Sequence, residues 1–238
     1  FTAIQQTVVV WISYRVHVEN PYDADKLHVY KHKVVVIPPG IENHVLTGIP
    51  CPRTVQIVKD KIKYQKEESI VLFLGRTHKA KGVNHAISAV GMLRKAGYRV
   101  KLVIAGPSKN FPNETKKHAK DFESYGIVHL GKVTDKEKVA LIDIAGVIII
   151  PSLSDVVEAY SLVASEAWAR RKLVVAYAVG ALKYRVKNGV NGYLARAMDQ
   201  KELAKKIIMA LSQRKNFKIP SDVWSWDKVT DQYWYAYT

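Results

Sequence analysis

The chain has 238 residues, of which 48% are hydrophobic and 24% are charged, as is usual for a soluble globular protein. No apolar run approaches the roughly 20 residues of a membrane-spanning helix, and the single Cys51 excludes an internal disulfide framework. The net charge of +16 attracts polyanions, whether phosphorylated substrates, anionic lipids or nucleic acid, although a solvated Lys-rich surface explains it equally well.

The chain begins at Phe1 without the pattern of a signal peptide, so we expect a fragment, or a numbering that omits the true start. With one cysteine, a reducing compartment is the default. We therefore expect a cytoplasmic protein, with peripheral contact to an anionic membrane left open.

The first part of the chain is too short to form an independent Rossmann unit. Asp23 and Asp25 spell the Asp-x-Asp motif of metal-dependent glycosyltransferases, but no clean apolar strand precedes them, and a solvated loop is the preferred interpretation. Residues 34–37 are expected to form a strand, which Pro38, Pro39 and Gly40 end. Residues 38–53 are predicted to be a linker.

The rest of the chain alternates short Val/Ile/Leu runs with amphipathic helical patterns. Such alternation predicts βαβ units and a doubly wound parallel α/β sheet. Thr134 followed by Glu137 predicts a capping box, and Asp199 predicts another helix start. The expected strands are residues 69–74, 100–105, 127–130, 146–150 and 173–176; the expected helices are 82–95, 134–144 and 199–211; and the aromatic residues 221–238 are expected to form a terminal helix.

Charged side chains follow the ends of two of the apolar runs. Arg76 and Lys81 come after residues 69–74, and Glu158 and Glu166 come after residues 146–150. Open parallel sheets bind ligands at the carboxyl ends of their strands. Two cations and two carboxylates at such an edge suit a ligand that carries both phosphate and hydroxyl groups, as a nucleotide sugar does.

Other readings of the sequence have less support. No G-x-G-x-x-G and no G-x4-G-K-[ST] motif occurs, and the eight histidines lack the spacing of a zinc site. Basic residues are not interleaved with aromatic residues along a strand, so no specific nucleic acid is expected as a partner. We expect no metal site.

A series of short motifs carries a family resemblance. The chain resembles the carboxyl-terminal, donor-binding domain of retaining GT-B glycosyltransferases of group 1, or family 4, which include phosphatidylinositol mannosyltransferases, sucrose synthases and bacterial glycogen synthases. Each motif is weak alone, and their joint order is the specific signal. The motifs are Val36-Ile37-Pro38-Pro39-Gly40-Ile41-Glu42, Leu74-Gly75-Arg76 with Lys81-Gly82, Val103-Ile104-Ala105-Gly106, Leu130-Gly131-Lys132-Val133, Pro151-Ser152, Glu158 to Glu166-Ala167, and Gly189-Val190-Asn191-Gly192.

The resemblance implies a Rossmann-like donor domain over residues 54–220. Residues 1–37 would then be the remnant of an amino-terminal acceptor domain, and residues 221–238 would cross back toward that domain. The implied reaction is transfer of a glycosyl group from a UDP-, GDP- or ADP-sugar to an unidentified glycan, lipid or protein, with retention and without a metal or other cofactor.

The resemblance also implies roles for single residues. Arg76 and Lys81 would hold the diphosphate, Glu158 would lie near the donor sugar, and all three would be catalytic residues. Glu166 would accept hydrogen bonds from the ribose. Further substrate contacts are expected at Gly75, Val133, Tyr160, Ser161 and Leu162.

The chain departs from the family pattern after Glu158. The family usually has Gly-Phe-Gly there, and this chain has Ala159, Tyr160 and Ser161. Glycines allow a close approach of the backbone to a ligand. Their loss and the high positive charge keep one alternative open, a non-catalytic module that binds nucleotide sugars or polyanions.

Overall fold

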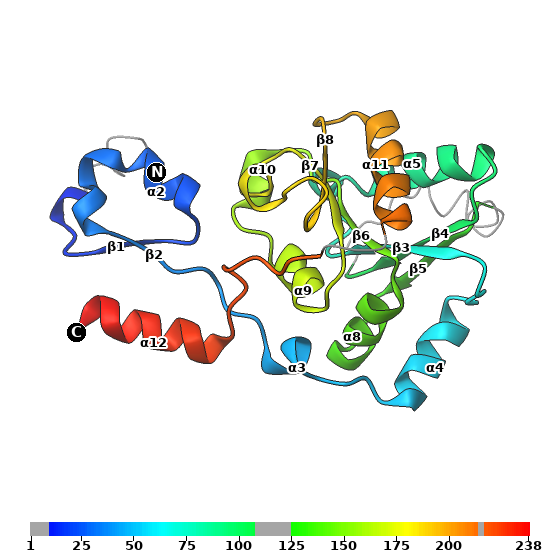
Figure 1. Ribbon diagram of the computed structural model, residues 1–238, viewed down its shortest axis with the longest axis horizontal. Coiled ribbons are helices and arrows are strands. Elements are labelled where there is room, and N and C mark those ends of the chain that lie inside the picture. Colours follow the sequence, from blue (N-terminus) through cyan, green and yellow to red (C-terminus); the bar gives the residue numbers. More distant parts are fainter. Residues whose placement is uncertain (1–9, 108–124, 214–216) are drawn as a thin grey trace.

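The computed structural model describes residues 10–107, 125–213 and 217–238, and the rest of the expected amino-terminal segment, residues 1–9, lies outside them. A six-stranded parallel sheet dominates the molecule, in the order β5-β4-β3-β6-β7-β8, and a two-stranded parallel sheet, β1-β2, lies apart from it (Figure 1). The predicted α/β class with a doubly wound parallel sheet is confirmed.

The six strands of the large sheet are β3 (Ser69–Leu74), β4 (Val100–Ala105), β5 (Ile127–Gly131), β6 (Val147–Ile150), β7 (Val174–Tyr177) and β8 (Gly192–Ala195). The helices around it are α3 (Asn43–Leu46), α4 (Pro52–Lys61), η2 (Lys79–Lys81), α5 (Val83–Lys95), α8 (Asp135–Ile144), η3 (Asp155–Glu158), α9 (Leu162–Ala169), α10 (Leu182–Arg185) and α11 (Gln200–Ser212). Every strand predicted after residue 53 is present within one residue at each end, and β8 was not predicted.

Helices cover both faces of this sheet. Helices α5 and α11 pack together on one face, while α4, α8 and α9 cover the other (Figure 1). The strands are therefore buried on both sides, and every residue of β4, β6 and β7 is buried. This explains why their sequences are apolar runs without alternation.

Two of the helices begin where the sequence predicted. Thr134 accepts a hydrogen bond from the backbone of Glu137, whose carboxylate accepts one from the Thr134 amide, so the capping box of α8 is complete. Asp199 caps α11 by accepting from the Glu202 amide. These caps fix the entry points of both helices onto the sheet.

The strand order creates a switch point between β3 and β6. The chain leaves β3 toward β4 and leaves β6 toward β7, so the loops after these two neighbouring strands diverge and leave a crevice at their carboxyl ends. The strand ends approach closely on both sides of β3. On the β4 side, a Cβ at Gly106 would lie 2.0 Å from the Gly75 carbonyl oxygen. A Cβ at Gly82 would lie 1.9 Å from the Pro151 carbonyl oxygen.

The amino-terminal residues form a small unit beside the large sheet. It consists of β1 (Val16–Val18), α2 (Pro21–Lys26), η1 (His28–Lys33) and β2 (Val34–Val36). Asp23 and Asp25 lie in α2, so the expected loop is a short helix, which Asn20 caps through the Asp23 amide. Asn20 and Pro21 supply its cap and first turn, a start signal that the sequence reading overlooked.

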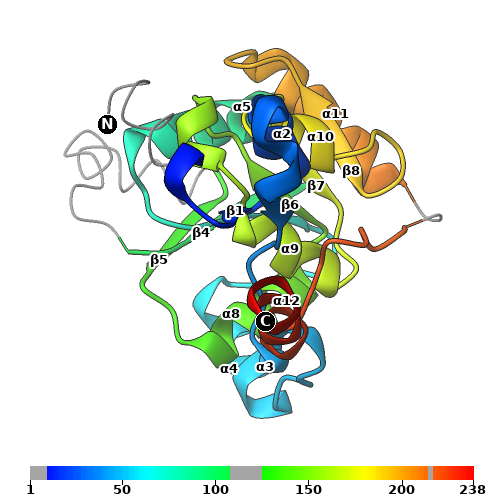
Figure 2. The same cartoon turned by 90° about the vertical axis from the view of Figure 1, so that its left-hand side faces the viewer.

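The carboxyl-terminal helix α12 (Trp226–Tyr237) returns to this small unit, as Figures 1 and 2 show. The Tyr233 hydroxyl lies 3.0 Å from Nδ1 of His17 in β1. Where the chain crosses between the two parts, the Ile41 amide donates to the Trp224 carbonyl at 2.8 Å. Among the helices that the structure describes, none is long and apolar enough to cross a membrane.

Candidate functional site

Lys81 and Glu158 meet in the crevice between β3 and β6. The Lys81 Nζ donates to Glu158 Oε1 at 2.6 Å and to the Val157 carbonyl at 3.1 Å. The Ser152 hydroxyl donates to the same carboxylate oxygen at 2.6 Å. The Glu158 side chain is only 2% exposed and that of Lys81 is 26% exposed. The two predicted site residues therefore form a partly buried ion pair.

Lys81 lies just before helix α5, which matches the predicted helix 82–95 to within one residue. It ends the 3₁₀ turn η2, and Gly82, in a left-handed conformation, is the N-cap of α5 that follows. The lysine is thus not in the first turn of a helix, and the carboxylate of Glu158 balances its charge. The bend at Gly82, which turns the chain into α5, aims Lys81 at the loop after β6.

Arg76 lies two residues beyond the end of β3 and is exposed. Its guanidinium makes no hydrogen bond or ion pair with any residue in the described part of the chain. Gly75, just before it, has φ of +138°, and its amide donates to the Ala105 carbonyl at 2.9 Å. Arg76 is therefore a planar fork of donors at the sheet edge, available to an anion.

Glu166 lies on α9 and pairs with a residue that the sequence reading did not select. Lys138 of α8 donates to Glu166 Oε1 at 2.8 Å, and the two side chains are 20% and 15% exposed. Burial acts to lower the pKa of Lys138, but the hydrogen bond and charge of Glu166 outweigh it, so this pKa is raised. Lys138 stays protonated and fixes the Glu166 carboxylate.

The loop from β6 to α9 contains the departure from the family pattern. Ser161, the N-cap of α9, has φ of 72° and ψ of 80°, a backbone conformation that favours glycine, and its hydroxyl makes no capping hydrogen bond. The Tyr160 side chain is buried, and its hydroxyl donates to the Asp222 carbonyl at 2.7 Å. Leu162, the first residue of α9, is 46% exposed.

Val133 lies between β5 and α8, where its half-buried side chain packs on the core. The strand that precedes it is the outermost strand on that side of the sheet, two strands from the switch point. The contacts described here connect Lys81 with Glu158 directly, and they do not join Val133 to either residue.

Three further residues shape this region and were not selected from the sequence. Ser152 holds Glu158, Lys138 holds Glu166, and Arg185 of α10 binds the loop at Tyr160 and Ser161. Ser152 belongs to the Pro151-Ser152 motif of the family resemblance, but no function was predicted for it. The sequence contains no local signal for the others, because each acts on a residue at least 20 positions away.

Carboxylates, histidines and the cysteine do not gather into a cation site in the described residues. No group of three or more of these side chains is placed to hold a metal ion there. The charged groups of the crevice are instead paired as cation with carboxylate, or exposed as Arg76 is.

Curated relatives resemble a large part of this chain. It is 29% identical over 189 residues to the D-inositol 3-phosphate glycosyltransferase of Xylanimonas cellulosilytica, covering 74% of this chain and 41% of that protein. It is 26% identical over 192 residues to the lipopolysaccharide 1,2-N-acetylglucosaminetransferase of Salmonella typhimurium, covering 74% and 50%. The chain thus spans about half the length of these relatives or less.

Solved structures share the fold at low identity. Sucrose-phosphate synthase from Thermosynechococcus elongatus matches with a TM-score of 0.71 and 20% identity, over 98% of this chain and 60% of that one. The Anabaena protein HepE in complex with UDP matches with a TM-score of 0.73 and 17% identity, over 94% and 63%.

A protein-family model matches the part of the chain that forms the large sheet. The model described as "Glycosyl transferases group 1" matches residues 55–221, which contain all six strands of that sheet, the Lys81–Glu158 pair and Glu166. Together with the curated relatives, this match shows that the chain belongs to the group 1 glycosyl transferases.

Proposed function

We propose that this chain carries the donor-binding part of a retaining glycosyltransferase that takes its sugar from a nucleotide sugar. The observation that supports this most is the meeting of Lys81 and Glu158 at the switch point of the sheet, where the exposed Arg76 also follows β3. In this proposal residues 54–220 bind the donor, residues 38–53 link to an acceptor domain that includes residues 1–37, and residues 221–238 cross back to it.

The charge of the site suits the leaving group of such a reaction. As the bond between sugar and phosphate breaks, negative charge grows on the diphosphate oxygens. Arg76 supplies two or more donors in a plane, and Lys81 supplies a point charge. The uncapped amino end of α9 adds backbone N–H groups with the positive end of the helix dipole. We propose that these groups stabilise the leaving diphosphate and that turnover needs no divalent metal.

The two glutamates have different surroundings and, in this proposal, different roles. Glu166 is oriented by Lys138, and a fixed carboxylate suits the vicinal hydroxyls of a ribose. Glu158 holds Lys81 and is nearly buried, so it acts at the reacting end of the donor through that pair. Tyr160 is turned inward, so any contact it makes with the donor is through its backbone.

Binding experiments on the full-length protein test the proposal most directly. UDP, GDP and ADP are each titrated by calorimetry, with UDP first because HepE was solved with UDP and with UDP-glucose. The Arg76→Ala variant should weaken binding of the favoured diphosphate by about 1.5–3 kcal/mol, the contribution of a charge-assisted hydrogen bond. Arg99→Ala is the matched control, since Arg99 lies just before the amino end of β4, whereas the crevice lies at the carboxyl ends of the strands.

Two further measurements separate the roles. Glu166→Ala should raise the donor KM with a smaller effect on kcat, because the ribose contact exists in both ground and transition states. Transfer measured in excess chelator should keep most of its rate. Absence of binding to all three diphosphates, or equal effects of Arg76→Ala and Arg99→Ala, would contradict the proposed site.

A further inference from the structure

We infer that Arg185 is a positioning residue: it holds the loop from β6 to α9 (residues 151–161, here the donor loop) in the shape that presents Glu158 and the amino end of α9. This inference rests on the proposed function, because the shape of the loop matters for donor binding only if that function is correct. Arg185 itself lies on α10, after β7, and its side chain is only 4% exposed.

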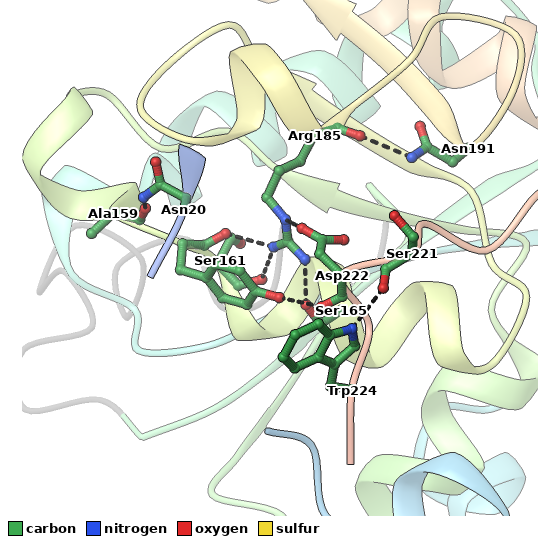
Figure 3. A network of polar contacts seen from close by, with 10 residues as sticks. Asn20, Ala159, Ser161, Ser165, Arg185, Asn191, Ser221, Asp222 and Trp224 are labelled. Carbon is green, nitrogen blue, oxygen red and sulfur yellow. Dashed lines mark hydrogen bonds and ion pairs between the residues drawn. The ribbon is translucent and has the colours of Figure 1, made fainter. Parts of the chain in front are cut away.

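All three nitrogen positions of the Arg185 guanidinium are engaged, as Figure 3 shows. Nη1 donates to the carbonyls of Tyr160 at 2.7 Å and Ser161 at 3.2 Å. Nη2 donates to the Ser165 hydroxyl at 2.6 Å, and Nε donates to Asp222 Oδ2 at 2.7 Å. A lysine has one nitrogen and cannot reproduce this fork.

The donor loop needs such a support because its backbone is strained at one residue. Ser161 has φ of 72°, which costs free energy in any residue with a Cβ and persists only where neighbours impose it. Arg185 binds the carbonyl of this residue and of the one before it. Its Cζ also lies 3.7 Å from the centroid of the Tyr160 ring, so the same side chain clamps the loop from two directions.

The support extends to Glu158 through the start of α10. The Ala181 amide donates to the Glu158 carbonyl at 2.9 Å, and a Cβ at Gly180 would lie 2.2 Å from that oxygen. The short helix that carries Arg185 therefore contacts the donor loop at Glu158 as well as at Tyr160 and Ser161. Loss of the Arg185 contacts should therefore also loosen the backbone that directs the Glu158 carboxylate toward Lys81.

A second anchor ties the clamp to the carboxyl-terminal segment. Asp222 accepts from Arg185 through its carboxylate and from the Tyr160 hydroxyl through its carbonyl. On the other side of the loop, the buried Asn20 donates to the Ala159 carbonyl at 2.8 Å. The donor loop is thus held between the segment that leads into α12 and the small amino-terminal unit.

The test compares Arg185→Met with Arg170→Met in the full-length protein. Arg170 is the matched control, because it also pairs with an aspartate, Asp143, and with backbone carbonyls, but at the far end of α9. Hydrogen–deuterium exchange of peptides from residues 153–161 is the first readout. The affinity for whichever of UDP, GDP or ADP binds the wild-type protein is the second.

We expect Arg185→Met to speed exchange of the donor loop and to weaken diphosphate binding by about tenfold. A tenfold change in affinity corresponds to the loss of about one hydrogen bond. Arg185→Lys should not restore either property. Arg170→Met should leave both near the wild-type values, even where it lowers the melting temperature. Asp222→Asn, which spares the loop contacts of Arg185, should give a smaller change in the same direction.

The decisive variant is Ser161→Gly in the Arg185→Met background. Glycine removes the strain that Arg185 offsets, so this double variant should recover slow exchange and most of the affinity. Exchange and affinity that respond equally to Arg185→Met and Arg170→Met, or no recovery with Ser161→Gly, would overturn the inference. Wild-type protein that binds none of the diphosphates would refute the proposed function instead, and exchange would still decide whether Arg185 holds the loop.

Discussion

The Lys81–Glu158 ion pair should behave as one unit, and a double-mutant cycle measures this. Lys81→Met leaves a carboxylate that is 2% exposed and that, among the residues the structure describes, keeps only the Ser152 hydroxyl as a partner. Removal of one member of a buried pair costs about 3–5 kcal/mol, and because Lys81 is 26% exposed we expect about 2–3 kcal/mol. Glu158→Gln keeps the shape and removes the charge, and should cost about 1–2 kcal/mol.

The double variant should cost clearly less than the sum, because neither partner is then left charged and unpaired. We expect a coupling free energy of at least about 1.5 kcal/mol in urea denaturation of the full chain. The Lys26–Asp23 pair, at 2.8 Å with side chains 56% and 36% exposed, is the control and should couple by about 0.5 kcal/mol or less. Additive effects at Lys81 and Glu158, within about 0.5 kcal/mol, would refute the pairing.

Two further predictions concern the supports of the site. A hydrogen bond from Lys61, with the capping hydrogen bonds of α8, lowers the pKa of Glu137 from 4.5 to about 2. Glu137→Gln should therefore lower the free energy of unfolding by about 2 kcal/mol at pH 7. This difference should be present above pH 4.5 and vanish as the pH falls toward 2, as acid titration of both proteins would show. A difference that does not change with pH would contradict the prediction. Gly106→Ala should lower the free energy of unfolding by about 1–3 kcal/mol more than Gly131→Ala does in denaturant titrations. A Cβ at position 106 would meet the Gly75 carbonyl, whereas one at position 131 would enter open space. Equal effects would contradict this prediction.

The core strands were predictable because burial on both faces leaves an unmixed apolar run. Residues 69–74 and 100–105 match β3 and β4 at both ends. Strand β8, Gly192–Ala195, begins with glycine, is half-buried in its middle and lies at the sheet edge, so no such run marks it. Helix α4 begins at Pro52, inside the predicted linker, although proline in a first turn is itself a start signal.

The partners of the site residues were less predictable than the residues themselves. Their spacing along the chain placed Lys81 and Glu158 after the ends of two apolar runs, and the structure makes these runs neighbouring strands and brings the two side chains into contact. The pairing of Glu166 with Lys138 depends on how α8 and α9 lie against each other, which no local pattern records. A buried Arg185 is still harder to foresee, because an arginine in a short helix is usually exposed. The domain boundaries stay a prediction.

The close pairing of the two chain crossings limits how the small unit can move relative to the large sheet. The Ile41 amide is bonded to the Trp224 carbonyl, and Gly40 lies so near Trp226 that an added Cβ would be 2.7 Å from its ring. These two connections, together with the hydrogen bond from Asn20 to the Ala159 carbonyl, attach the small unit to the large sheet at more than one point. Any residue larger than glycine at position 40 would push Trp226 away and loosen the fastening between the two parts.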